Sequence, residues 1–89
     1  MKPTMPRTAG KRLRSLRESL GLSMSDVEQL TRELAAVRRN PRLRVPKARL
    51  SDIETKGRMP GIHCLYALAR VYGCDVRKLL GFCGLKPEG

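Results

Sequence analysis

Residues 46–60 read PKARLSDIETKGRMP. Leu50 and Ile53 have the three-residue spacing of one helix face, and their neighbours are mostly charged or small. Pro46 is tolerated in a first helical turn, where its missing amide hydrogen has no intrahelical partner, and Gly57 is typical of a helix end. The pattern predicts a helix over about residues 46–57. Its outward face would carry Lys47, Ala48, Arg49 and Asp52.

Two helices are predicted before this segment. The first covers residues 10–20 and has leucines at helical spacing. The second begins after Ser23, whose hydroxyl can form a capping box with the Asp26 carboxylate. It extends to about Arg38 and stops before Pro41. Its apolar stripe consists of Val27, Leu30, Leu34 and Val37.

Two further helices are predicted after it. The fourth covers residues 62–72 and ends at Gly73, while the fifth is short and is capped by Asp75. No strand candidate is found, so the fold class is all-α with five helices. Residues 1–9 contain two prolines and no apolar periodicity, which indicates a flexible basic arm, and residues 83–89 are expected to form a loose tail. One domain remains, over residues 10–82.

The chain is strongly basic. Nineteen Lys and Arg oppose eight Asp and Glu in 89 residues, giving a net charge of +11. Fifteen of these bases and six of the acids lie within residues 1–60. A Lys or Arg that neutralises a phosphate releases a condensed counterion, so this excess favours a polyanionic partner. Only three residues are aromatic, which argues against a reader of single-stranded nucleic acid that stacks bases on such side chains.

The sequence offers no cofactor, metal or catalytic site. Cys64, Cys74 and Cys83 are far apart in the sequence, and the single histidine, His63, neighbours one of them. A zinc site needs about four convergent ligands, so the cysteines are interpreted as small buried apolar groups. No nucleophile–histidine arrangement, phosphate-binding loop or paired carboxylates occur, and the chain is not expected to be an enzyme. Without a signal peptide or a membrane span, it is expected to be cytoplasmic.

Three segments together resemble the phage-repressor-like (Cro/CI, or Xre) helix-turn-helix family. They are RLRSLRESLGLS at residues 12–23, LSDIETKGRMP at residues 50–60 and LYALARVYGCDVRKLL at residues 65–80. The resemblance covers about residues 10–82 and implies a compact five-helix, lambda-repressor-like domain. The connection between the second and third helices is longer than the tight turn that the family usually has there.

The resemblance also implies roles for individual residues. The helix over residues 46–57 would read bases in the major groove of double-stranded DNA through Lys47, Ala48, Arg49 and Asp52. Asp52 would either accept a hydrogen bond from cytosine or orient an arginine. Phosphate contacts would come from Lys56, Arg58, Arg42 and Arg44, although the arginines of residues 38–44 also suit a plain solvated loop. Arg17 and Glu54 stand where the family has a partly buried ion pair between the first and third helices.

These features predict a sequence-specific transcriptional regulator that binds double-stranded DNA. The resemblance further implies a homodimer on a pseudo-palindromic site, which would have to use the last two helices and the tail around Leu80, Phe82 and Leu85. The alternative is a protein-interaction module, such as an antitoxin or adaptor, that keeps the fold without specific DNA binding. The outward face of the third helix distinguishes them, because an interaction module would favour an apolar patch there.

Overall fold

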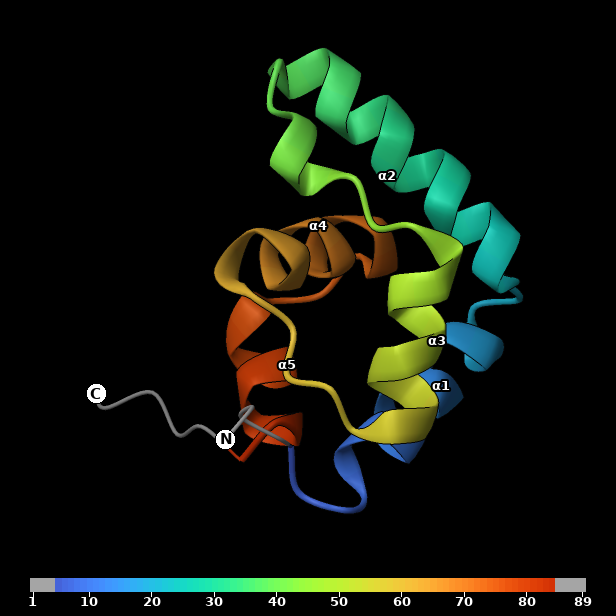
Figure 1. Ribbon diagram of the computed structural model, residues 1–89, viewed down its shortest axis with the longest axis vertical. Coiled ribbons are helices and arrows are strands. Elements are labelled where there is room, and N and C mark those ends of the chain that lie inside the picture. Colours follow the sequence, from blue (N-terminus) through green and yellow to red (C-terminus); the bar gives the residue numbers. More distant parts are fainter. Residues whose placement is uncertain (1–4, 85–89) are drawn as a thin grey trace.

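The chain folds into helices whose ends lie close to those predicted from the sequence. The structure is a computed structural model and describes residues 5–84, in which no β-strand occurs, so the all-α prediction is confirmed (Figure 1). The elements are α1 (Ala9–Ser19), α2 (Met24–Arg38), the 3₁₀ helix η1 (Pro41–Leu43), α3 (Lys47–Lys56), α4 (Ile62–Tyr72) and α5 (Val76–Phe82).

Local hydrogen bonds explain where the helices begin and end. The backbone N–H of Asp26 donates to Ser23 Oγ at 3.0 Å and the N–H of Ser23 donates to Asp26 Oδ2 at 2.8 Å, which is the predicted capping box of α2. Helices α3 and α4 end at Gly57 and Gly73, both with φ of +68°. Glycine is favoured at a left-handed position of this kind because it has no Cβ atom.

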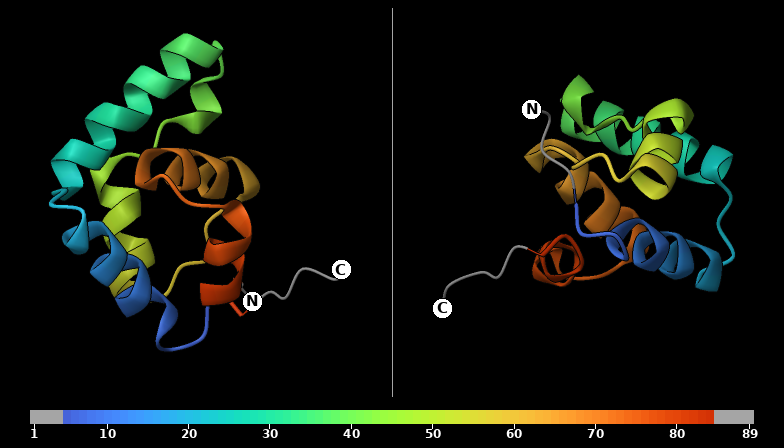
Figure 2. Two further views of the ribbon diagram at one scale, coloured as in Figure 1. Left: turned by 180° about the vertical axis from the view of Figure 1, so that it is seen from behind. Right: turned by 60° about the horizontal axis from the view of Figure 1, so that its bottom comes forward.

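The helices bury one apolar core. Helix α4 lies near its centre and packs against α2, η1 and α5, while α1 packs against α3 (Figures 1 and 2). Arg12 adds a contact between α1 and α5, because its guanidinium lies 5.9 Å from the ring centre of Phe82. The largest fully buried apolar side chains are Leu13, Val27, Val45, Leu50, Ile53, Leu68, Leu79 and Cys83.

Helices α1 and α3 lie very close together at Gly10. A Cβ atom added to Gly10 would lie 2.5 Å from the carbonyl oxygen of Glu54 and 3.0 Å from that of Ile53. Only a residue without a side chain fits between the two backbones at this point. The distance between α1 and α3 is therefore set by this glycine.

The long connection between α2 and α3 is anchored along its length. It leaves α2 through Arg39, whose φ of +53° is left-handed, and Asn40 Oδ1 then accepts a hydrogen bond from the N–H of Arg42 at 3.1 Å to start η1. Leu43 and Val45 are buried. The connection is therefore not a freely solvated loop, because its last part places two side chains, those of Leu43 and Val45, in the core.

Three residues predicted to lie in a flexible arm or a loose tail are buried in the structure: Met5, Ala9 and Cys83. Met5 is buried, its N–H donates to the carbonyl of Gly57 at 2.9 Å, and its sulfur lies 3.4 Å from Sγ of Cys83, which is also buried. Ala9, expected in the arm, is buried and begins α1. Single apolar residues carry no periodicity, so this packing could not be predicted from the residue pattern. Residues 1–4 and 85–89, including Leu85, lie outside the described residues.

Candidate nucleic-acid interface

Helix α3 presents a basic and small-residue face to solvent. Leu50 and Ile53 are buried, whereas Lys47, Ala48 and Arg49 are exposed. Alternation of this kind follows from 3.6 residues per turn, which places residues three apart on the same side. The three outward residues are those that the sequence assigned to base reading, and Asp52, the fourth, is half-buried at the edge of this face.

A buried ion pair fixes α3 to α1. The guanidinium of Arg17 donates to Glu54 through two hydrogen bonds, from Nε at 2.8 Å and from Nη2 at 2.9 Å, and its Nη1 donates to the carbonyl of Leu22 at 2.8 Å. The side chain of Arg17 is 8% exposed and that of Glu54 is fully buried. The hydrogen bond to Glu54 raises the pKa of Arg17. The pair predicted between these residues is therefore present, and its paired hydrogen bonds restrict rotation of α3.

Two side chains of α2 hold the start of α3. Glu28 Oε2 accepts a hydrogen bond from the N–H of Lys47 at 2.8 Å, and Thr31 Oγ1 accepts one from the N–H of Val45 at 3.0 Å. Pro46, the residue before α3, provides no side-chain cap, so the Glu28 carboxylate takes that role and complements the positive end of the helix dipole. Sequence reasoning missed both residues, because they lie 19 and 14 positions from the amides that they accept from.

Asp52 is occupied by neighbouring cations. Its carboxylate lies 3.4 Å from Nζ of Lys56 and 3.9 Å from Nη1 of Arg58, and its backbone carbonyl accepts from the N–H of Arg58 at 3.3 Å. Of the two roles that the sequence left open, this arrangement favours orientation of a basic side chain. Exposed pairs of this kind contribute little to stability.

Arginines of three segments meet beside α3. Arg42, Arg44 and Arg49 line a hollow of about 470 Å³ together with His63 at the start of α4. Arg49 also lines an adjoining hollow of about 230 Å³ with Arg58. The anchored connection thus brings Arg42 and Arg44 next to α3. From the sequence alone, these arginines suited either phosphate contacts or a plain solvated loop.

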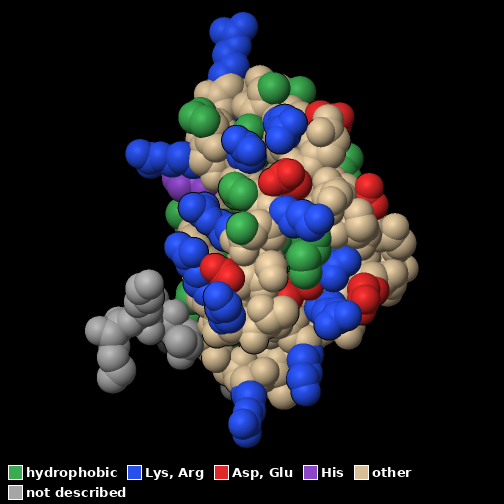
Figure 3. All heavy atoms as spheres, turned by 45° about the vertical axis from the view of Figure 1, so that its right-hand side comes forward, with side chains coloured by type: hydrophobic (Ala, Val, Ile, Leu, Met, Phe, Trp, Pro, Cys, Tyr) green, Lys and Arg blue, Asp and Glu red, His purple; other side chains and the backbone are tan. Residues whose placement is uncertain are grey.

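The six exposed bases in and around α3 form what we call the basic surface. Figure 3 shows the side of the molecule that carries α1, α2 and α3, where Lys and Arg side chains extend from end to end with carboxylates among them. Neither Lys47 nor Lys56 lines the two hollows. The basic surface consists of Arg42, Arg44, Lys47, Arg49, Lys56 and Arg58.

The described residues contain no group that suits a metal ion. Within residues 5–84, no three His, Cys, Asp or Glu side chains come together. Cys64 and Cys83 are buried and Cys74 is half-buried, and burial raises the pKa of the Cys64 thiol to about 11. A thiol held neutral in this way is a poor nucleophile and a poor metal ligand. Over the same residues, no helix combines the length and apolar character needed to cross a bilayer.

Comparison with known proteins assigns no relative to the chain. No family model matches it, and neither a curated protein nor a solved structure matches it significantly. What the chain does must therefore follow from its residues and their geometry.

Proposed function

We propose that the chain is a sequence-specific DNA-binding regulator with a lambda-repressor-like helix-turn-helix fold, in which α2 and α3 form the helix pair and α3 enters the major groove. One observation carries the proposal: a helix held rigidly by Arg17, Glu54 and Glu28 presents Lys47, Ala48 and Arg49 to solvent. Base reading requires a helix of fixed orientation whose outer side chains are free, and the major groove of B-DNA accommodates one such helix.

The outward residues have the chemistry that base edges require. Lys47 and Arg49 can donate to N7 and O6 of guanine, and the methyl group of Ala48 can contact that of thymine. One good bidentate contact contributes about 1–3 kcal/mol of discrimination against a wrong base. Asp52, paired with Lys56 and Arg58, would position these cations for phosphates.

The remaining bases of the basic surface would contact the DNA backbone. Arg42 and Arg44 come from the long connection and Arg58 from the segment after α3, and together with Arg49 they line two adjoining hollows beside the reading helix. A DNA helix with its groove over α3 has phosphates on either side of that groove. The lengthened connection would therefore enlarge the footprint on DNA.

The test separates base reading from phosphate binding. Duplexes selected from a random pool by the purified chain provide the preferred site, and binding is then measured over a salt series. Lys47→Ala and Arg49→Ala should relax the preference at one or two positions. Arg44→Ala and Arg58→Ala should weaken binding to all duplexes about equally and reduce the salt slope by about 1 each.

Matched substitutions elsewhere provide the control. Arg32→Ala and Lys78→Ala remove exposed charges from α2 and α5, outside the basic surface, and should change binding much less. If all four substitutions in the basic surface affect binding no more than these two, α3 does not contact DNA and the proposal is wrong.

A protein-interaction module is the second candidate, because large apolar side chains are exposed. Val37 and Leu30 on α2 are 79% and 37% exposed. These residues lie away from the outward face of α3, which is basic where an interaction module of this kind would be apolar. The binding series above distinguishes the two, since an interaction module without DNA binding shows no salt-dependent duplex affinity that depends on α3.

A further inference from the structure

Helix α2 keeps apolar side chains in solvent over its second half. Val37 is 79% exposed and Leu30 is 37% exposed, and with the half-buried Leu34 and Val71 they line one groove between α2 and α4. Its volume is about 580 Å³. A second protein surface that covered Val37 and Leu30 would remove this apolar area from water. We call this feature the α2–α4 groove; its lining residues are Leu30, Glu33, Leu34, Val37, Arg38, Arg70 and Val71.

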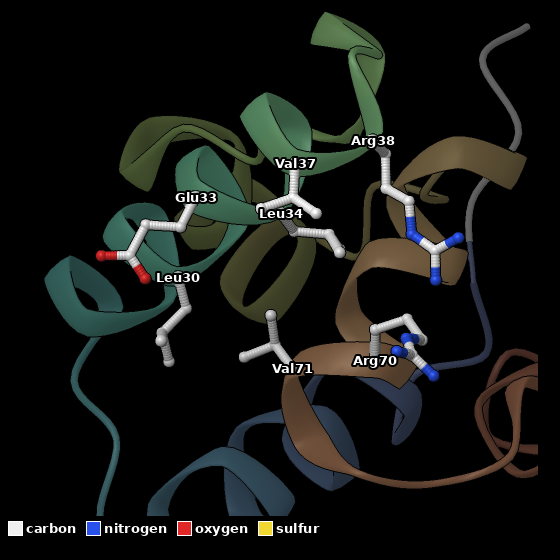
Figure 4. A pocket seen from close by; sticks show the side chains of 7 residues that line it. All are labelled: Leu30, Glu33, Leu34, Val37, Arg38, Arg70 and Val71. Atoms are coloured by element: carbon white, nitrogen blue, oxygen red, sulfur yellow. The ribbon is translucent and has the colours of Figure 1, made fainter.

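Opposite charges stand at the two ends of the α2–α4 groove. Figure 4 shows the carboxylate of Glu33 at one end, the guanidinium groups of Arg38 and Arg70 at the other, and the four apolar side chains between them. Within residues 5–84, none of these three charged groups belongs to an ion pair. The groove thus has an apolar middle, an acceptor end and a donor end.

We propose that two copies of the chain associate through their α2–α4 grooves about a two-fold axis. A two-fold contact uses the same patch on both copies, so the patch must be complementary to itself. Rotation by 180° about an axis through the apolar middle brings Glu33 of one copy to the Arg38 and Arg70 of the other, at both ends at once. The apolar side chains of the two grooves then cover each other.

The charge of the whole chain does not prevent this contact. Each copy carries +11, but the residues that line the α2–α4 groove include two arginines and one glutamate, so the local excess is small. Charges farther away than about 8–10 Å are screened at physiological salt. None of the groove residues belongs to the basic surface, so the proposal is independent of DNA binding.

This proposal differs from the contact expected from the sequence. Of the residues expected to form a dimer contact, Leu80 and Phe82 are half-buried, and Leu85 lies outside the described residues. Val37 and Leu30, which the helical pattern places in one stripe with the buried Val27, are the large apolar residues that α2 leaves in solvent. The proposal therefore places the contact between copies on α2 and α4 and not on the last two helices.

Paired charge reversals test the two-fold arrangement directly. Glu33→Arg alone places cations against cations at both ends, and the double substitution Arg38→Glu with Arg70→Glu places anions against anions. Each variant by itself should have a dimer Kd at least tenfold weaker than the native chain in sedimentation equilibrium. An equimolar mixture of the two variants restores opposite charges at both ends and should form a heterodimer with near-native affinity.

Controls separate the groove from general charge effects and from misfolding. Glu18→Arg and Lys78→Glu make comparable charge changes outside the groove and should leave the dimer intact. Val37→Glu introduces a charge at a residue that is already 79% exposed, so it should abolish the dimer while circular dichroism stays helical. A native chain that stays monomeric up to millimolar concentration, or a mixture that remains monomeric, overturns the proposal.

Discussion

The two sides of the helix assembly differ in how tightly their helices meet. Between α1 and α3, Gly10 lets the backbones touch, and a buried pair of Arg17 and Glu54 links the helices. Between α2 and α4, Leu30 and Val37 remain in solvent and a groove is left open. The tight side fixes the orientation of α3, which we propose reads DNA, and the open side leaves the groove that we propose binds a second copy. Substitutions on the two sides should therefore have very different effects on stability.

The largest effect is expected from breaking the buried ion pair. Glu54→Ala leaves the guanidinium of Arg17 buried without its counter-ion and should lower the free energy of unfolding by about 3–5 kcal/mol. Urea unfolding followed by circular dichroism measures this loss. Glu18→Ala is the matched control, because it removes a pair with Arg14 at 3.5 Å whose side chains are about half exposed, and it should cost less than about 1 kcal/mol. Equal losses of unfolding free energy would mean that the buried pair stabilises the fold no more than an exposed pair does.

A smaller loss of stability is expected from adding one methyl group at Gly10, where α1 and α3 lie very close together. Gly10→Ala forces α1 away from the carbonyl of Glu54 and should cost about 1–3 kcal/mol. The control is Gly81→Ala in α5, where an added Cβ has no neighbour within 4 Å and where alanine favours the helix by about 0.5–1 kcal/mol. Thermal unfolding of both variants should shift in opposite directions. If Gly10→Ala leaves the melting temperature unchanged, α1 and α3 can move apart without any loss of stability.

The sequence predicted the elements better than their contacts. Helical spacing, the Ser23–Asp26 capping box and the glycines at positions 57 and 73 act within one turn of chain, so they determine helix ends locally. The pairing of Arg17 with Glu54 came from resemblance and is present in the structure. The outward placement of Lys47, Ala48 and Arg49 followed from periodicity alone.

Other features depend on tertiary packing and could not be predicted. The hydrogen bonds from Lys47 to Glu28 and from Val45 to Thr31 join residues on different elements, and no local pattern indicates them. The burial of Met5 beside Cys83 joins the two ends of the described chain. The exposure of Val37 depends on where α4 lies relative to α2, because the same apolar stripe would suit a fully covered helix.

The connection between α2 and α3 should depend on a single hydroxyl. Thr31→Val keeps the shape of the side chain but leaves the buried N–H of Val45 without an acceptor, which should cost about 1–2 kcal/mol. Amide exchange provides the specific readout, because the Val45 amide should lose protection more than the amides of α1. Thr55→Val is the control, since the hydroxyl of Thr55 is exposed and only donates to the Ser51 carbonyl within its own helix. Unchanged protection at Val45 would show that the connection is held by Leu43 and its neighbours instead.

The smallest effect concerns the capping box at the start of α2. The backbone N–H of Ser23, followed by its side chain, lowers the pKa of Asp26 below the ordinary value. A carboxylate with a lowered pKa in the folded state adds stability above its unfolded pKa of about 3.9, and this contribution is lost as the pH falls through the folded pKa. Asp26→Asn should therefore lower the melting temperature at pH 7, and the difference from the native chain should shrink on acidification towards pH 2.

Salt distinguishes this cap from a simple surface charge. Asp75 also has a lowered pKa, caused first by the side chain of Arg77, so Asp75→Asn should lose much of its effect at 1 M salt. Asp26→Ala removes the acceptor of an uncharged backbone amide as well as the charge, so part of its effect should persist at the same salt concentration. If both effects disappear with salt, the carboxylate of Asp26 acts only through long-range charge.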